Sequence, residues 1–158
     1  MTGIFARQIV IGIGNCDRGD DAAGRRVAQL LRGQLPAGIE VAELHGEATA
    51  ILACLDGAAA AYLVDACATG APAGTVRRFD VVARPLPQAA FGLSTHGFGL
   101  IEAIELARAL GELPPRCIVY AVEGQSFETG APLSTPVEAA VVTLARELIA
   151  EIVGVQNG

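Results

Sequence analysis

Continuous apolar runs constrain the fold of this chain more than any other feature. Each run ends in turn-forming or acidic residues, and segments with apolar residues at helical spacing lie between the runs. Unbroken apolar strands are typical of a parallel sheet that is covered on both faces. The pattern predicts an α/β fold: one three-layer domain over residues 1–158, with a largely parallel sheet of about five strands and helices on both faces. The runs occupy residues 8–14, 59–66 and 117–122.

The remaining expected elements are shorter or less regular. Residues 39–44 alternate as a strand does, and residues 48–55 form a short apolar helical segment. Residues 75–81 also suit a strand, but their outward positions are charged, which favours an edge of the sheet. Longer helices are expected over residues 97–110 and from Thr135 to Gly154.

Composition excludes several classes of function. The net charge is −6 and the basic residues cluster no further than adjacent pairs, so the chain lacks the basic surface that nucleic-acid binding needs. No stretch reaches the ~18 uninterrupted apolar residues of a membrane span, and the N-terminus does not resemble a signal peptide. The four cysteines lack metal or disulfide spacing. We therefore expect free thiols and a cytoplasmic protein.

Acidic residues follow two of the predicted central strands. Asp17, Asp20 and Asp21 come after the first apolar run, and Asp65 closes the second. If the strand order begins 2-1-3, these two strands are neighbours and their carboxyl ends open into one crevice. Carboxylates gathered there repel one another unless a cation joins them.

Three interpretations compete for the turn after the first strand. Gly12-Ile13-Gly14 begins like a dinucleotide fingerprint, but Asp17 stands where the third glycine belongs, and acidic residues at a helix start disfavour phosphate. A structural interpretation has Asp20 capping the following helix and Asn15 bracing the turn. The third interpretation is a metal site formed by Asp21, Asp65 and a nitrogen ligand.

Two histidines are available as that nitrogen ligand. His96 lies in a glycine-flanked approach to a helix, at the expected carboxyl side of the sheet. His45 follows a strand next to glutamates, and we expect it to be an ordinary surface residue. Two carboxylates and one imidazole suit a divalent transition ion such as Ni²⁺ or Zn²⁺, with open positions left for water or a substrate group. The favoured ligands are therefore Asp21, Asp65 and His96.

Four blocks of the sequence resemble the hydrogenase maturation proteases, in the same order as in that family. The first has the family form G-x-G-N-x4-D-[DE], and Ala22 replaces the glycine that usually follows it. The second is Val64-Asp65-Ala66 with a glycine-rich continuation, the third surrounds Ser94-Thr95-His96, and the fourth is the Leu-Ser entry to the last helix. Because alanine favours helix more than glycine does, we expect helical backbone at Ala22.

The resemblance implies a function and a site. It implies an endopeptidase that removes the C-terminal extension of a nickel-loaded NiFe-hydrogenase large-subunit precursor. In the family the metal ligands fall on positions that match Asp21, Asp65 and His96, which would be both the nickel-contacting and the catalytic residues. The nickel would arrive with the precursor, so the free enzyme need hold no metal.

A rival interpretation is a non-catalytic metal- or nucleotide-binding module on a flavodoxin-like sheet. It predicts binding without proteolysis. No Ser-His-Asp or Cys-His set supports covalent catalysis, and Ser94 and Ser126 qualify only by residue type. Cys16 lies inside the first block, but neighbouring aspartates disfavour its thiolate, so we expect it to do no chemistry.

Overall fold

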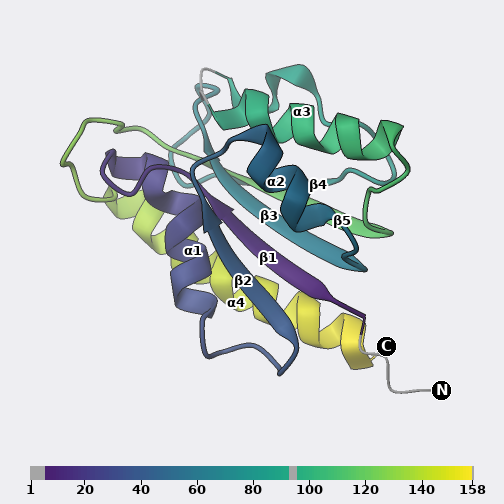
Figure 1. Ribbon diagram of the computed structural model, residues 1–158. Helices are drawn as coiled ribbons and strands as arrows, with labels where there is room; N and C mark the ends of the chain where they lie inside the picture. Colours follow the sequence, from purple (N-terminus) through teal and green to yellow (C-terminus); the bar gives the residue numbers. More distant parts are fainter. Residues whose placement is uncertain (1–5, 93–95, 158) are drawn as a thin grey trace.

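The computed structural model describes residues 6–92 and 96–157, with the side chains of residues 96, 156 and 157 outside the description. Its described part is a three-layer α/β domain with one five-stranded sheet between two pairs of helices (Figure 1). Helices α2 and α3 cover one face of the sheet, and helices α1 and α4 cover the other. The predicted fold class is confirmed.

Strands and helices alternate along the chain, except that the third strand leads through a turn directly to the fourth, as the sequence pattern predicts. The strands are β1 (Gln8–Ile13), β2 (Ile39–Leu44), β3 (Ala60–Cys67), β4 (Val76–Asp80) and β5 (Arg116–Glu123). The helices are α1 (Ala23–Leu31), α2 (Ala48–Leu55), α3 (His96–Ala109) and α4 (Thr135–Asn157), with short 3-10 turns η1 (Gly19–Ala22) and η2 (Gln88–Phe91).

The strand order is β2-β1-β3-β5-β4, so the expected 2-1-3 beginning is correct. Strands β1, β2, β3 and β5 are parallel, and β4 pairs antiparallel with β5 at the edge, where its charged residues favour it. The chain crosses to the opposite side of β1 between β2 and β3. Ligands of open α/β sheets bind at the carboxyl ends of strands where the order reverses, and here that place is the β1–β3 junction.

Side chains of the central strands alternate between two apolar layers. On β3, Ala61, Leu63 and Cys67 face the α2–α3 layer, whereas Tyr62 and Val64 face the α1–α4 layer. The central strands are buried on both faces, which explains why they form unbroken apolar runs. This alternation also decides which way a polar residue at a strand end points.

The end of the last helix differs from the prediction, whereas the backbone at Ala22 agrees with it. Helix α4 continues to Asn157, so the expected end at Gly154 is wrong. An exposed glycine inside a helix costs only about 1 kcal/mol, which is too little to end the helix. Ala22 has helical backbone angles, φ −79° and ψ −4°, as predicted. Within the described ranges, no helix has both the length and the apolar character required to cross a bilayer.

Candidate functional site

The turn after β1 holds Asp21 against the strand that precedes it. The backbone N–H of Asn15 donates a hydrogen bond to Oδ2 of Asp21 at 3.2 Å, and the Asn15 side chain accepts one from the N–H of Asp17 at 2.8 Å. Gly14 has φ +147°, and a Cβ there would lie 2.0 Å from the carbonyl oxygen of Asp21. The turn therefore requires glycine, and Asn15 braces it as predicted. Asp21 itself is 3% exposed.

Asp65 lies at the carboxyl end of β3, next to β1. Its side chain is fully buried, and Oδ1 accepts a hydrogen bond of 2.8 Å from the N–H of Ala66. By the alternation along β3, its carboxylate points to the same side as Leu63 and Cys67, toward the layer that contains α3. The Asp65 side chain is thus oriented toward the layer that contains α3, the helix whose first residue is His96.

The start of α1 packs closely against the carboxyl ends of β1 and β3, which brings Asp21 and Asp65 to the same region. A Cβ at Gly24 would lie 2.2 Å from the carbonyl oxygen of Val64 and 2.5 Å from that of Ile13. Because Val64 directly precedes Asp65, and Gly24 is one turn beyond Asp21, only glycine lets the start of α1 reach the ends of both strands. The structure places Asp21 and Asp65 at the same edge of the sheet, as predicted.

The backbone of His96 begins α3 at this edge. In the first turn of α3, a Cβ at Gly99 would lie 2.0 Å from the carbonyl oxygen of Gly46, which follows β2. On the other side of residues 93–95, Gly92 forms a parallel bridge with Ala68, just beyond the end of β3. The His96 side chain, and with it Ser94 of the third sequence block, lies outside the described residues.

The sharing of one ion by Asp21, Asp65 and His96 stays a prediction. Among the side chains that the structure describes, no three of the His, Cys, Asp and Glu type form a group that would hold a metal ion. The two aspartates supply two carboxylate donors, and the predicted third donor belongs to His96. His45, the other histidine, is exposed directly after β2, in keeping with the surface role expected for it.

Asp20 joins two distant segments of the chain. No side-chain hydrogen bond caps η1 or α1, so the alternative interpretation in which Asp20 caps the following helix is wrong. Its fully buried carboxylate instead accepts hydrogen bonds from the N–H groups of Gln125, Ser126 and Ser134 and from the Ser134 hydroxyl, at 2.7–3.1 Å. Asp20 therefore fastens the segment between β5 and α4 to the turn that carries Asp21.

Glu123 is a buried acidic residue that the sequence interpretation missed. It closes β5, is 2% exposed and lies opposite Cys67 in the sheet. Its carboxylate accepts hydrogen bonds from the N–H and hydroxyl of Thr69, at 2.8 and 2.5 Å, and from the N–H of Gly70 at 3.3 Å. Glu123 thereby holds the chain that leaves β3 just beyond Asp65. Its position at a strand end is the same signal that drew attention to Asp65.

All four cysteines are free, as predicted. Burial raises the pKa of the Cys67 and Cys117 thiols to about 12, so both stay protonated at neutral pH. Cys16 is exposed, and its sulfur lies 3.8 Å from the side-chain nitrogen of Gln29. The two buried thiols are therefore core residues rather than nucleophiles.

Comparisons with known proteins identify the family of this chain. The family model described as "Hydrogenase maturation protease" (HycI) matches residues 39–151. The chain belongs to the hydrogenase maturation protease family. The match covers well over half of the chain, including Asp65, His96 and the segment that Asp20 fastens. A comparison with curated protein sequences gives no match.

Solved structures of hydrogenase maturation proteases have the same fold. The hydrogenase maturating endopeptidase HybD from Escherichia coli is 27% identical with a TM-score of 0.75, over 92% of this chain and 91% of that one. The [NiFe] hydrogenase maturation protease HycI from Thermococcus kodakarensis is 26% identical with a TM-score of 0.69, over 95% and 94%. An Escherichia coli endopeptidase that is 24% identical reaches a TM-score of 0.80, over 91% and 90%, which concerns the fold alone.

Proposed function

We propose that this chain is an endopeptidase that removes the C-terminal extension of a nickel-loaded NiFe-hydrogenase large-subunit precursor, and that Asp21, Asp65 and His96 recognise the nickel. One observation carries the proposal. In a member of the hydrogenase maturation protease family, two aspartates lie buried at the adjoining carboxyl ends of β1 and the β3 strand beside it. This is the place where an open α/β sheet binds its ligand.

The donor set suits nickel that arrives as part of the substrate. Two carboxylates and an imidazole are ligands that a divalent ion of this kind accepts, and three protein ligands leave coordination positions for the groups of the precursor. Three donors with a net charge of −2 also hold an ion less firmly than the four-ligand cages of structural zinc. The enzyme would therefore engage nickel that the precursor brings.

Hydrogen bonds hold both aspartates in place before an ion arrives. The N–H of Asn15 fixes Asp21, and the N–H of Ala66 fixes Asp65, so neither side chain needs reordering when the ion arrives. Bound there, nickel would polarise the carbonyl group to be attacked or activate a water molecule.

The decisive experiment mixes the purified protein with a nickel-loaded large-subunit precursor and follows the loss of the extension by gel mobility and mass. We expect cleavage with the nickel-loaded precursor and none with the nickel-free one. His96→Ala should abolish cleavage, whereas His45→Ala, the matched control at an exposed strand end, should leave it nearly unchanged. Metal binding without cleavage would instead favour a non-catalytic metal-binding module. If His45→Ala lost activity and His96→Ala kept it, the imidazole ligand would be His45, and the metal site would lie at the end of β2.

A further inference from the structure

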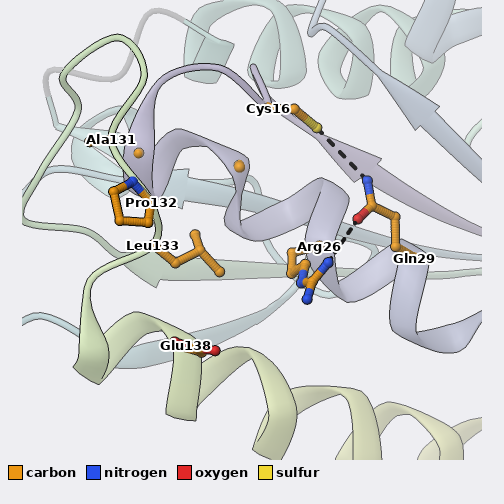
Figure 2. Close-up of a pocket in the computed structure, with 9 residues that line it drawn as sticks. Cys16, Arg26, Gln29, Ala131, Pro132, Leu133 and Glu138 are labelled. Atoms are coloured by element: carbon orange, nitrogen blue, oxygen red, sulfur yellow. Dashed lines mark hydrogen bonds between the residues drawn. The ribbon is translucent and has the colours of Figure 1, made fainter.

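A hollow of about 370 Å³ lies between α1 and the segment that leads into α4. Figure 2 shows Arg26 on α1, with Ala131, Pro132 and Leu133 on the opposite wall and Glu138 on α4 below. The Gln29 side chain, also on α1, is directed toward the Cys16 sulfur. Its size is at the lower end of the range for ligand pockets. We call it the α1–α4 hollow.

The α1–α4 hollow adjoins the candidate site through η1. Gly19 and Ala22, the first and last residues of this turn, both line the hollow. Between them, Asp20 and Asp21 point inward and are buried. A polypeptide that crosses the carboxyl edge of the sheet at Asp21 therefore meets the hollow within one turn of 3-10 helix.

The far wall of the hollow is held in place before any ligand binds. Asp20 accepts the four hydrogen bonds described above, and the N–H of Gly130 donates to the carbonyl oxygen of Asp17 at 2.7 Å. Gly19 has φ +55°, and a Cβ there would lie 2.4 Å from the carbonyl oxygen of Ser126. The hollow is thus a preformed feature, which reduces the entropy cost of filling it.

The lining combines an apolar wall with one positive side chain, Arg26, and one negative side chain, Glu138. Arg26 is exposed, and its one recorded hydrogen bond in the described part of the chain is a long one, 3.5 Å, to Gln29. Glu138 is also exposed, and no ion pair is recorded between it and Arg26 among the described residues. A peptide chain matches this lining, since its C=O groups accept from a guanidinium, its N–H groups donate to a carboxylate, and its side chains suit Ala131 and Leu133.

We propose that the α1–α4 hollow binds an extended segment of the substrate polypeptide next to the bond that is cut. This inference rests on the proposed function and adds to it a peptide-binding subsite. The hollow would fix the register of the chain relative to Asp21, so its contribution should appear in substrate binding more than in the chemical step.

Cys16 offers a direct test, because its exposed thiol lines the hollow. Iodoacetamide labelling of the wild-type protein is followed by peptide mass spectrometry, with the nickel-loaded precursor in excess and mostly uncleaved. We expect the precursor to slow the labelling of Cys16 several-fold while Cys54, half-buried on α2 across the sheet, reacts at an unchanged rate. A precursor without its C-terminal extension should protect less. Labelling of Cys16 at the same rate with and without precursor would overturn the inference.

Steady-state kinetics give a second, independent test. Arg26→Gln removes the positive charge and Ala131→Trp fills the hollow, and each should raise KM about tenfold with a smaller change in kcat. Arg146→Gln, an exposed charge removal further along α4, is the matched control and should leave KM unchanged. An unchanged KM in both hollow variants would overturn the subsite while leaving the proposed protease standing. Protection of Cys16 without any cleavage would support the subsite and count against the protease.

Discussion

Buried acidic residues at the carboxyl edge of the sheet and the partly buried Glu151 near the opposite end differ in the groups that contact them. At the carboxyl edge, the donors recorded for Asp20 and Glu123 are backbone N–H, hydroxyl and thiol groups, all uncharged. Near the amino end of β5, Glu151 of α4 instead receives two guanidinium groups, from Arg78 at 2.7 Å and Arg116 at 2.6 Å, and the hydroxyl of Tyr120.

The difference separates a structural ionic cluster from a candidate cation site. Burial tends to raise the pKa of Glu151, but hydrogen bonds from Arg78 and Tyr120 and the charges of both arginines outweigh it, so the pKa is lowered from 4.5. The cluster of Glu151 holds α4 onto β4 and β5. At the other end, uncharged donors orient the carboxylates of Asp20 and Glu123. Oriented carboxylates near Asp21 and Asp65 suit the approach of a cation.

The largest expected effect comes from replacing a carboxylate of the site itself. Asp65→Asn keeps the size of the side chain and the acceptor for the Ala66 N–H, but removes the charge. We expect precursor processing to fall on the order of 100-fold or more, because a nickel-contacting charge is lost. Circular dichroism should show that the fold is retained, since the substitution leaves no cavity. Normal processing by Asp65→Asn would contradict the view that the carboxyl edge of the sheet is a cation site and the Glu151 cluster a structural one.

Asp20→Asn is expected to have the next largest effect, and it acts on stability as well as on activity. An amide offers one acceptor oxygen where the carboxylate offers two, and its NH₂ group would face N–H and O–H donors. We expect a loss of about 2 kcal/mol in the free energy of unfolding, with a partial loss of processing because the turn of Asp21 shifts. Urea denaturation measures the first and the cleavage assay the second.

The exposed Asp17 of the same turn is the control for Asp20. Asp17→Asn leaves the backbone contact with Gly130 intact and should change the free energy of unfolding by less than about 0.5 kcal/mol. Equal effects of the two substitutions would show that net charge, rather than the hydrogen bonds of Asp20, governs this turn.

Glu151→Gln should reduce stability without touching activity. We expect a loss of about 1–2 kcal/mol at neutral pH, a modest value because the arginines are partly exposed and screened by solvent. A folded-state pKa below 4.5 means that the stabilisation is present above pH 4.5 and is lost as the pH falls through the lowered pKa. The gap between wild type and Glu151→Gln should therefore close on acidification, as urea denaturation at several pH values would measure. A gap that widens toward acid would contradict this account.

Much of the fold, and the placement of Asp21 and Asp65 at one edge of the sheet, were predictable because their signals are local. Buried parallel strands produce unbroken apolar runs, and the point where a run ends marks the carboxyl edge, which brought Asp21 and Asp65 forward. Glu123 closes β5 after an apolar run and gives the same signal, but the glycine-containing loop that follows makes this signal less distinct.

The role of Asp20 was not predictable from spacing. Its partners lie 105–114 residues further along the chain, so no local pattern reports them, and the local alternative of a helix cap was wrong. The α1–α4 hollow has the same origin, since its two walls come from opposite ends of the sequence. Long-range hydrogen bonds of this kind become visible only once the sheet order is known.

The smallest expected effect is at Cys16, which lies at the carboxyl edge but outside the group of buried carboxylates. The thiol is exposed, and the contact recorded for it within the described residues is the 3.8 Å one to Gln29. Serine keeps nearly the same shape and the same donor and acceptor functions. Cys16→Ser should therefore process the nickel-loaded precursor within about twofold of wild type, since a substitution that leaves no buried group unpaired has little effect. Complete loss of processing would instead make the sulfur a ligand or a nucleophile, and the carboxyl edge would then work through a thiolate as well as through Asp21 and Asp65.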